Sequence, residues 1–332
     1  MKLLLIANYV RGHGGISVQV ELLRDLLRKD GVDVEIFSLK GSFWHRLFSP
    51  FRLLSIGRRY DVFHIHACSF FGFLPAVVGI HVGRLMNKRI LLTYHGGDFR
   101  EYIGKYTRLV KTYLSKTDVN IVLSQYIGNF FDEFGLPYIV LPNILTTKSV
   151  YRERDVLRPS FICLRAMTPA YNIPCILKAY ARFKERHPEA TLTLLGDGPE
   201  RIKLEQYVKD KNILDVGFVG RVPNEEVFVF LEKSDIMLSS PLTDNMPLSL
   251  LEGFSAGLLV ISSRVGGVPY MIRDGENGFL FESDDDEELE RKMEHAITDQ
   301  VLSKSMIKEA YKGLSYYSWS ANKEKYYQLC RG

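Results

Sequence analysis

The sequence predicts an α/β protein made of two doubly wound parallel sheets, one following the other along the chain. Three observations predict this fold class. Short, almost wholly apolar runs alternate with segments whose apolar residues recur at helical spacing, which is the pattern of strands covered by helices on both faces. The same pattern begins again near residue 160. Finally, a length of 332 residues favours two domains over one or three.

The first half begins with a strand and a glycine-rich turn. The strand is Leu3–Asn8, and the turn that follows it reads RGHGG. From Ser17 onward the apolar residues lie on one helical face, until Gly31 ends the helix. Apolar runs predict the other strands of this half: Val32–Ser38, Val62–His66, Ile90–Tyr94 and Asn120–Ser124.

The second half repeats this alternation. Its clearest predicted helix is Pro174–His187, and a polar stretch over 145–159 separates the halves, so we expect domains at residues 1–150 and 151–315. Two such domains in sequence place a ligand crevice where the carboxyl ends of their strands face each other. The predicted strands are Ser160–Leu164, Thr191–Leu195, Val216–Val219, Ile236–Ser239 and Leu259–Ser262.

Charge is distributed unevenly between the halves. The chain holds 43 basic and 39 acidic side chains, and this net charge of +4 does not indicate a nucleic-acid-binding protein. Residues 1–150 contain 19 basic and 11 acidic side chains, whereas residues 151–332 contain 24 and 28. The asymmetry suggests that the first half faces an anionic partner such as a membrane surface or a phosphorylated lipid. A difference in composition that has no function explains the charge asymmetry equally well.

The cysteines and the apolar stretches bear on the compartment. No CxxC pair or metal-ligand spacing occurs, so in a chain of this size the cysteines predict reduced thiols in a cytoplasmic protein. The longest nearly uncharged stretch, 67–82, is interrupted by Pro75 and falls short of the roughly 18 uninterrupted apolar residues that a membrane span requires. The sequence predicts no transmembrane segment. The cysteines are Cys68, Cys163, Cys175 and Cys330.

Two features of the first half are candidates for ligand contact. Gly14 and Gly15 precede the first helix, where glycine lets backbone N–H groups approach an anion. A tight turn between strand and helix is the alternative use of these glycines. His95 follows a strand directly and is followed by two glycines and Asp98, a position where open sheets bind ligands. The alternative for His95 is a hydrogen-bonded structural histidine.

The segment 239–253 is the strongest candidate in the second half. If a helix begins at Pro247, the N–H groups of Leu248 and Ser249 point towards a phosphate. Glu252, about one turn later, is placed to accept hydrogen bonds from ribose hydroxyls, and Asp244 is placed to reach a sugar hydroxyl. In the alternative interpretation, Asp244 caps the helix and Glu252 is a surface carboxylate.

Several segments together resemble the family 4 glycosyltransferases. The resemblance extends over nearly the whole chain and is densest over 160–280. It implies the GT-B fold with two Rossmann-like domains, a nucleotide-sugar donor, retention of configuration at the anomeric carbon, and no required metal or cofactor. The segments that carry it are GDGP (196–199), ILDVGFVGRV (213–222), LEGFSAGLLVIS (251–262), VGGVP (265–269) and DGENG (274–278).

The resemblance also implies roles for individual residues. Glu252 matches the ribose-binding second glutamate of the E-x7-E pattern, and Asp244 stands where the first glutamate is usual, one methylene shorter. Arg165 matches the pyrophosphate-binding arginine, but Tyr171 occupies the expected position of the companion lysine. His95 matches the histidine beside the transferred sugar. Other positions implied to contact the donor are Gly14, Gly15, Asn172, Val222, Asn245, Met246, Pro247, Leu248 and Ser249.

The expected reaction breaks the bond between a sugar and a nucleoside diphosphate. Negative charge then builds on the β-phosphate, where Arg165, the Tyr171 hydroxyl, the Gly14–Gly15 amides and the helix N-terminus would stabilise it. No unassigned carboxylate suggests a double displacement, so the resemblance implies acceptor attack from the departing face. We expect a UDP- or GDP-sugar donor and a glycan or lipid-linked acceptor in cell-surface polysaccharide biosynthesis.

Two further segments have an expected place. Residues 43–59 mix aromatics, leucines and arginines, which suits docking on the inner face of an anionic membrane, although the same residues could pack on the domain. Pro50 breaks any single long helix there. Residues 316–332 predict a final helix, which in the resembled fold crosses back to the first domain; a simple terminal helix on the second domain is the alternative.

Three other functions compete with sugar transfer. A nucleotide-sugar epimerase would form product from the donor alone. A nicotinamide dehydrogenase would need the full G-x-G-x-x-G turn, but Ser17 stands where its third glycine belongs. A non-catalytic protein that binds sugar nucleotides is suggested by the missing lysine.

Overall fold

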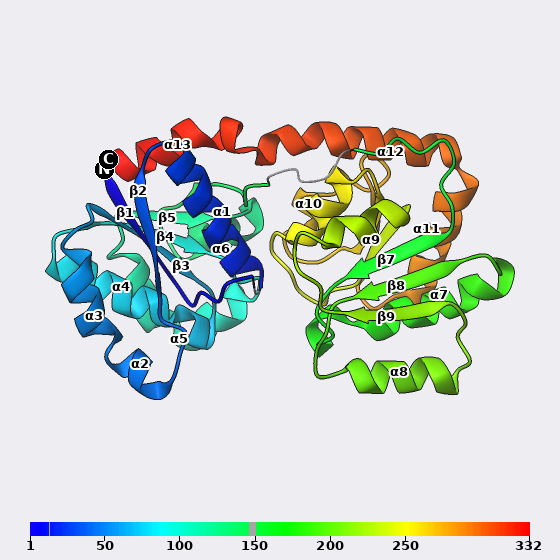
Figure 1. Ribbon diagram of the computed structural model, residues 1–332, viewed down its shortest axis with the longest axis horizontal. Helices are drawn as coiled ribbons and strands as arrows, with labels where there is room; N and C mark the ends of the chain where they lie inside the picture. The colour runs from blue at the N-terminus through cyan, green and yellow to red at the C-terminus, as the bar shows by residue number, and fades with distance from the viewer. Residues whose placement is uncertain (13, 146–150) are drawn as a thin grey trace. The chain divides into compact units, whose positions relative to one another are not determined.

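The chain folds into two compact units. We describe them from a computed structural model that covers residues 1–12, 14–145 and 151–332 (Figure 1). Unit 1 consists of Met1–Thr146 and Tyr316–Gly332, and unit 2 of Thr147–Ser315. The expected boundary between residues 150 and 151 lies at the edge of a segment outside the described residues.

Unit 1 contains a six-stranded sheet in the order β2-β1-β3-β4-β5-β6, in which every pair is parallel. Five strands match predicted strands to within two residues at each end. The sixth, β6, was not predicted, because two residues are too short to produce a periodic signal. The strands are β1 Lys2–Ala7, β2 Asp33–Ser38, β3 Val62–Ala67, β4 Arg89–Tyr94, β5 Val119–Val122 and β6 Ile139–Val140.

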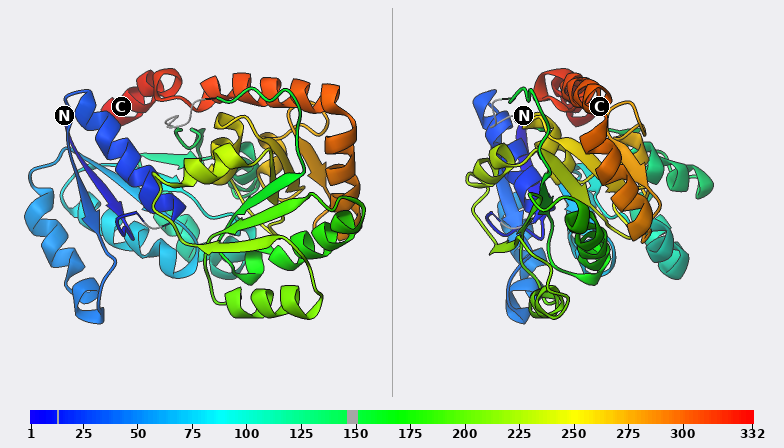
Figure 2. Two further views of the ribbon diagram at one scale, coloured as in Figure 1. Left: turned by 45° about the vertical axis from the view of Figure 1, so that its right-hand side comes forward. Right: turned by 90° about the vertical axis from the view of Figure 1, so that its right-hand side faces the viewer.

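Helices cover both faces of this sheet. Leu3 and Leu5 of β1 pack with residues of α1 and α13, whereas Leu4 and Ile6 pack with residues of α3 to α6. Figure 2 shows α1, in blue, lying across the strands of unit 1. The helix predicted from Ser17 begins two residues earlier. The helices are α1 Gly15–Lys29, α2 Phe43–Leu47, α3 Ser49–Gly57, α4 Leu74–Leu85, α5 Phe99–Leu114, α6 Gln125–Glu133 and α13 Trp319–Arg331.

Unit 2 contains a second six-stranded sheet in the order β12-β11-β10-β7-β8-β9, again with parallel neighbours. All five predicted strands are confirmed, and β12 was not predicted. Because β7 lies beside β10, the chain after each of these strands emerges at the same edge. The strands are β7 Ser160–Leu164, β8 Thr191–Leu195, β9 Val216–Gly220, β10 Ile236–Ser239, β11 Leu259–Ser263 and β12 Phe279–Phe281.

The helices of unit 2 also lie on both faces of its sheet. Side chains of α7, α8, α11 and α12 form one apolar core with alternate strand residues. On the other face Gly253 of α10 lies close to Met237 and Val260, where a Cβ would come within 3.0 and 3.3 Å of their side chains. The helices are α7 Ile173–Arg186, α8 Arg201–Asp210, α9 Val227–Lys233, α10 Leu248–Ser255, α11 Asp286–Thr298 and α12 Gln300–Gly313.

Within the described ranges, the helices are too short or too polar to traverse a lipid bilayer.

Candidate functional site

Arg165 occupies the carboxyl edge of the unit 2 sheet. It is the first residue after β7, and Ser239 is the last residue of the neighbouring strand β10. The Ser239 hydroxyl accepts hydrogen bonds from Nε and Nη2 of Arg165, at 3.2 and 3.0 Å. The Arg165 side chain is only 7% exposed. The two strand ends therefore hold a guanidinium group in one orientation at the edge where parallel sheets bind ligands.

Asp244 pairs with this guanidinium. Its Oδ2 lies 2.9 Å from Arg165 Nη1. Its Oδ1 accepts a hydrogen bond from the Asn245 N–H group, and its carbonyl oxygen accepts one from Gly267 N–H. A Cβ on Gly266 would lie 1.9 Å from that carbonyl oxygen, so only glycine permits this close approach. The loop before α10 is thus fixed by a turn from another part of the sequence.

The pairing changes the interpretation of Asp244. The alternative in which it caps the following helix is wrong, because the residue at the cap position is Pro247 and no side chain of the described residues caps α10. The helix begins at Leu248, one residue later than predicted. The predicted contact of Asp244 with a sugar hydroxyl stays a prediction, and in this structure the carboxylate is bound to Arg165.

Tyr171 also contacts Arg165. The guanidinium carbon is 5.0 Å from the centre of the Tyr171 ring, which is a cation–π contact. The Ser240 hydroxyl donates to the carbonyl oxygens of Tyr171 and Asn172, at 3.0 and 2.9 Å. Asn172 is in the left-handed region with φ of 43°, and its side chain donates to Asp284. The ring of Tyr171 therefore supports the guanidinium, and the predicted phosphate contact of its hydroxyl stays a prediction.

The glycines of the GDGP segment shape the loop that carries Arg165. A Cβ on Gly196 would lie 2.0 Å from the Arg165 carbonyl oxygen, and one on Gly198 would lie 2.3 Å from that of Met167. Backbone hydrogen bonds join the same segments, from Arg165 to Leu195 and from Met167 to Asp197. The resemblance alone gave the GDGP motif no physical role. Its physical role is to let two backbone segments pack without side chains between them.

The N-terminus of α10 lies at the end of the Asp244 loop. The N–H groups of Leu248 and Ser249 belong to the first helical turn, which has no acceptors within the helix. Ser249 is 91% buried, and its hydroxyl has no hydrogen-bond partner among the described residues. Glu252 follows one turn later and is half-buried. Helix N–H groups and dipole together favour a bound anion.

The remaining predicted donor contacts of unit 2 have less distinctive positions. Asn245, Met246 and Pro247 are buried within the loop that leads to α10. Val222 is half-buried and follows β9, at the carboxyl edge of the same sheet.

Unit 1 holds the other predicted site residues. Gly14, with φ of 76°, is the N-cap of α1, and Gly15 is the first residue of that helix. Both glycines are exposed, and a Cβ on Gly14 would contact nothing, so its backbone conformation and not crowding favours glycine there. Ser17, in place of a third glycine, accepts a hydrogen bond from Val10 N–H at 3.1 Å. Residue 13 of this turn lies outside the described residues.

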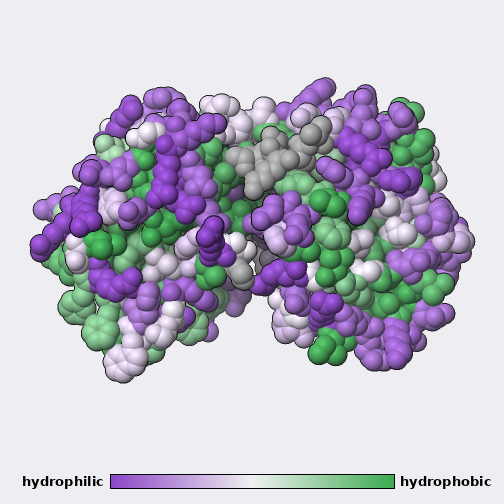
Figure 3. Space-filling view, in the orientation of Figure 1, coloured by the Kyte–Doolittle hydropathy of each residue, from purple (hydrophilic) through white to green (hydrophobic). Residues whose placement is uncertain are grey.

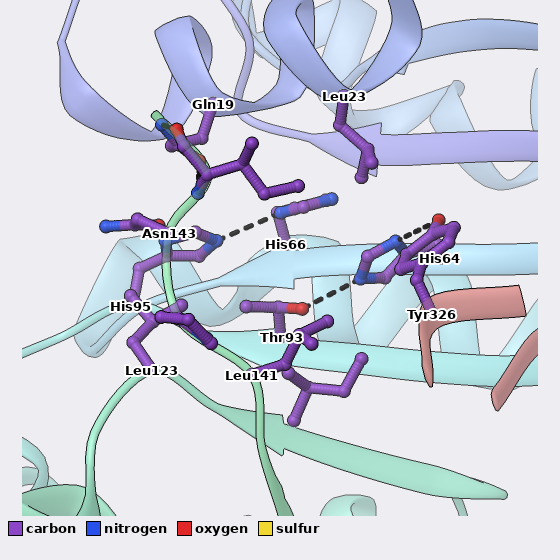
Figure 4. Close-up of a pocket in the computed structure, with 13 residues that line it drawn as sticks. Gln19, Leu23, His64, His66, Thr93, His95, Leu123, Leu141, Asn143 and Tyr326 are labelled. Carbon is purple, nitrogen blue, oxygen red and sulfur yellow. Dashed lines mark hydrogen bonds between the residues drawn. The ribbon is translucent and has the colours of Figure 1, made fainter. Parts of the chain in front are cut away.

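His95 directly follows β4, and its N–H group donates to the Ala67 carbonyl oxygen at 2.8 Å. Its Nε2 atom lies 2.9 Å from Nδ1 of His66 (Figure 4). Burial lowers the pKa of His95 to about 4, which keeps the ring neutral near pH 7. His66 was not singled out from the sequence. Two histidines that alternate with apolar residues indicate a β-strand and no particular function.

The structure thus brings together Arg165, Tyr171 and Asp244 and gives a role to Ser239, which begins the candidate segment 239–253 but had no predicted contact. Gly14, Gly15 and His95 belong to unit 1. Their predicted meeting with the unit 2 residues around one donor stays a prediction.

Residues 43–59 form two short helices instead of one. The break falls at Phe48, between α2 and α3, and Pro50 lies in the first turn of α3, where proline is tolerated. Apolar side chains gather over these helices at the lower left of Figure 3. The large exposed ones are Phe43 (71%), Trp44 (64%), Leu47 (49%), Phe48 (51%) and Phe51 (68%).

Comparison with known proteins gives two family matches. Residues 152–313 match the family described as "Glycosyl transferases group 1", and residues 38–148 match "Glycosyltransferase Family 4". The two matches lie on different parts of the chain and together cover most of it.

Individual relatives agree with these matches. The chain is 25% identical over 264 residues to an uncharacterized glycosyltransferase of Methanocaldococcus jannaschii, a match that covers 78% of this chain and 72% of the relative. It is 20% identical over 370 aligned positions to the alpha-monoglucosyldiacylglycerol synthase of Acholeplasma laidlawii, covering 98% and 90%. Among solved structures, Anabaena HepE in complex with UDP-glucose is similar with a TM-score of 0.80 and 16% identity, covering 99% of both chains.

Proposed function

Because the chain belongs to the family 4, group 1 glycosyltransferases, we propose that it transfers a sugar from a UDP- or GDP-sugar to a glycan or lipid-linked acceptor with retention of configuration. The enzyme class follows from the family, while the donor, the acceptor and the stereochemistry are the proposal. The observation that carries it is the oriented Arg165 guanidinium at the carboxyl edge of the unit 2 sheet.

Arg165 suits the diphosphate of such a donor. A guanidinium has five N–H groups. Among the described residues, the bonds of Arg165 to Ser239 and Asp244 use three of these groups. Two N–H groups are therefore left for a ligand. Arginine can bind phosphate through two N–H groups at once. The first turn of α10 supplies further N–H donors in the same unit.

The same groups can favour the reaction over simple binding. Charge on the β-phosphate increases as the bond to the sugar breaks, so donors held in place beforehand stabilise the transition state more than the ground state. We assign this role to Arg165 and to the α10 N-terminus, with Glu252 binding the ribose. The leaving phosphate would take the proton of the acceptor hydroxyl, which then attacks from the departing face and retains the configuration.

The identity of the nucleotide is supported by a structural relative. HepE was solved with UDP-glucose, which favours a UDP-sugar as the first donor to test. The name of the Acholeplasma relative indicates a diacylglycerol glycolipid product, which supports a lipid-linked acceptor for the present chain.

We place the acceptor reaction at an anionic membrane surface in cell-surface polysaccharide biosynthesis. The exposed aromatics of α2 and α3 stand beside Arg46, Arg52, Arg58 and Arg59 in the sequence. Aromatic and apolar side chains insert at the boundary of headgroups and acyl chains, and arginines attract anionic headgroups. In this proposal unit 1 docks peripherally on the inner face of the membrane.

A donor screen tests the proposal. The full chain is heated with UDP-, GDP- and ADP-sugars, and a ligand at 100 times its Kd that binds only the folded protein adds about 2.7 kcal/mol to stability. The stabilising donor is then incubated with lipid extracts, and NMR of the product gives the anomeric configuration. We expect a UDP- or GDP-sugar to stabilise the protein and the product to keep the donor configuration. Conversion of the donor without an acceptor would indicate an epimerase instead.

A further inference from the structure

Three histidine rings form a row within unit 1. His64 and His66 point to the same side of β3, and His95 follows the neighbouring strand β4. The ring of His66 lies between the other two, with centroid distances of 4.2 Å to His64 and 5.2 Å to His95. His64 and His66 are 2% and 4% exposed, so both rings are removed from solvent.

The partners of His64 are complete without His66. Its Nδ1 lies 2.9 Å from the Tyr326 hydroxyl of α13, and its Nε2 lies 2.7 Å from the Thr93 hydroxyl (Figure 4). Burial lowers the pKa of His64 to about 3, so this ring is neutral near pH 7. His64 is therefore explained as a structural group that joins α13 to the sheet.

His66 is different because only one of its ring nitrogens has a partner. Nδ1 lies 2.9 Å from His95 Nε2, whereas Nε2 is buried and has no hydrogen-bond partner among the described residues. A cavity of about 30 Å³ adjoins these rings. Polar and apolar residues both line this cavity. The lining includes Gln19, His64, His66, His95 and Asn143.

A contact between residues distant in sequence holds one wall of the cavity. Gln19 of α1 bonds both backbone groups of Ile144, with Nε2 to the carbonyl oxygen at 2.8 Å and Oε1 to the N–H at 2.9 Å. This pairing holds the chain segment that contains Asn143 over the histidine row (Figure 4). The two hydrogen bonds therefore fix the backbone at Ile144, next to the residues that line the cavity beside His66.

The bond between the rings allows two arrangements of the protons. A neutral imidazole carries one N–H group and one acceptor nitrogen. If His95 Nε2 donates, the hydrogen of His66 is on its buried Nε2, where the described residues offer it no acceptor. If His66 Nδ1 donates, its Nε2 carries only a lone pair, so no N–H group is buried without an acceptor among the described residues. Among backbone groups, a buried N–H without a partner is rarer than an under-satisfied carbonyl oxygen, and by analogy we favour the second arrangement.

We propose that His66 is a positioning residue that donates from Nδ1 to Nε2 of His95 and thereby holds the His95 proton on Nδ1. The hydrogen bond at one ring nitrogen decides which other nitrogen carries the proton. His95, which is half-buried, then carries its hydrogen-bond donor on Nδ1, and this donor suits an oxygen of the ligand. That this oxygen belongs to the transferred sugar rests on the proposed function, whereas the tautomer does not.

The tautomer can be measured directly in the full chain. Long-range ¹H–¹⁵N correlation spectra of protein labelled at its eight histidines distinguish a protonated from an unprotonated ring nitrogen. The His95 signals are assigned from their loss in His95→Gln. We expect wild-type His95 to carry its proton on Nδ1 at pH 7. A proton on Nε2 of wild-type His95 would overturn the proposal, and this result needs no variant of His66.

Variants of His66 separate positioning from packing. His66→Asn can still donate through its side-chain amide, so we expect His95 to keep its tautomer, whereas His66→Phe removes the donor and should shift His95 towards the Nε2-protonated form. Thr93→Val is the matched control, because it removes a polar partner from the same row without touching the pair of His66 and His95. An unchanged His95 tautomer in a folded His66→Phe variant would refute the positioning role.

The kcat of sugar transfer is a second measurement, which requires an active enzyme. We expect His66→Phe to lower kcat about tenfold or more, since misplaced reacting groups lose rate steeply, and His66→Asn to recover most of this loss. If the tautomers behave as expected but no transfer is found with any donor, the proposed function fails and the positioning of His95 stands. If transfer is found but the His95 tautomer does not change in the His66 variants, the proposed function stands and the positioning role of His66 fails.

Discussion

Arg165 and Asp244, from two distant loops of unit 2, form an ion pair with 2.9 Å between Nη1 and Oδ2. The pair is largely buried, at 7% and 19% side-chain exposure, so solvent screens it weakly. It neutralises the guanidinium that the proposed function assigns to the donor diphosphate. A diphosphate that binds Arg165 must therefore do so next to a carboxylate, and this arrangement can be tested from both sides of the pair.

Replacing Arg165 with alanine removes the oriented donor. We expect the turnover number of sugar transfer to fall by at least about tenfold, because one lost charge-assisted donor to a developing oxyanion costs a few kcal/mol. Arg165→Lys keeps the charge but cannot donate two parallel hydrogen bonds, so its turnover number should lie between those of the wild type and Arg165→Ala. The matched control is Arg186→Ala, which removes an exposed arginine that pairs with Glu290. A loss of less than tenfold in Arg165→Ala would discredit the assigned role.

Replacing Asp244 with asparagine keeps the shape of the side chain and removes its charge. At about 6 Å and an effective dielectric constant of about 20, a unit charge contributes roughly 3 kcal/mol, and partial screening still leaves an effect. We therefore expect UDP to bind at least about fivefold more tightly, measured by titration calorimetry. Asp215→Asn makes the same charge change at the opposite edge of the sheet, before β9, and should leave UDP affinity unchanged. Unchanged or weaker UDP binding in Asp244→Asn would contradict an electrostatic repulsion between the Asp244 carboxylate and the diphosphate.

The two contacts of Tyr171 can be told apart by a pair of variants. If the ring supports Arg165 through the cation–π contact, Tyr171→Phe keeps the function and Tyr171→Ala loses about 2- to 30-fold in kcat/KM, as expected for about 0.5–2 kcal/mol. If the hydroxyl binds phosphate, Tyr171→Phe should lose as much as Tyr171→Ala. Steady-state kinetics with a saturating acceptor decide between the two contacts. We expect the phenylalanine variant to retain activity within about twofold.

The sequence predicted the fold far better than the site. Buried parallel strands are apolar along their whole length, so β1, β7 and β10 were recognisable from composition alone. Strands of two or three residues, such as β6 and β12, give no period to detect. Helix starts were displaced by one or two residues, as at Leu248, because a proline is compatible with several positions around the first turn.

Site geometry depends on contacts that no local pattern encodes. Asp244 was recognised as a candidate, but its partner is set by the lateral order of β7 and β10, which brings Arg165 and Ser239 together. The role of Gly266 likewise appears only when the Asp244 carbonyl oxygen is found against it. His66 shows the same limit, since its place in an apolar strand is typical of a structural residue until His95 is seen beside it.

The buried histidines make unit 1 sensitive to mild acid. Burial lowers the pKa of His64 to about 3 and of His95 to about 4, and it holds the pKa of His66 well below its usual range. Below about pH 6.5 the unfolded chain binds protons that the folded chain does not, so stability is complete above this pH and falls as the pH approaches 4. Each such histidine contributes a slope of up to about 1.4 kcal/mol per pH unit.

This pH dependence can be followed in unit 1 alone. Both tryptophans, Trp44 and Trp319, belong to unit 1, so denaturant unfolding monitored by tryptophan fluorescence reports on it. We expect the free energy of unfolding to decline from pH 6.5 to pH 4.5. His66→Asn should reduce the slope by about a third, since one of three similar groups is removed. A free energy of unfolding that stays constant over this range would contradict the burial of neutral histidines.

Membrane docking depends on large apolar side chains that are exposed on α2 and α3. Phe43 and Phe51 are 71% and 68% exposed on α2 and α3, and burying each in a bilayer interface contributes on the order of 1.5–3 kcal/mol. We expect the double variant Phe43→Ser/Phe51→Ser to reduce co-sedimentation with phosphatidylglycerol-containing vesicles at least about tenfold while keeping its melting temperature. The double variant Ile202→Ser/Val301→Ser is the matched control, because these residues are 80% and 79% exposed on unit 2.

Because Arg46 and Arg58 add electrostatic attraction, the wild-type protein should bind neutral phosphatidylcholine vesicles less well and lose binding at high salt. Equal binding to neutral and anionic vesicles, or equal loss in both double variants, would remove α2 and α3 as the docking surface.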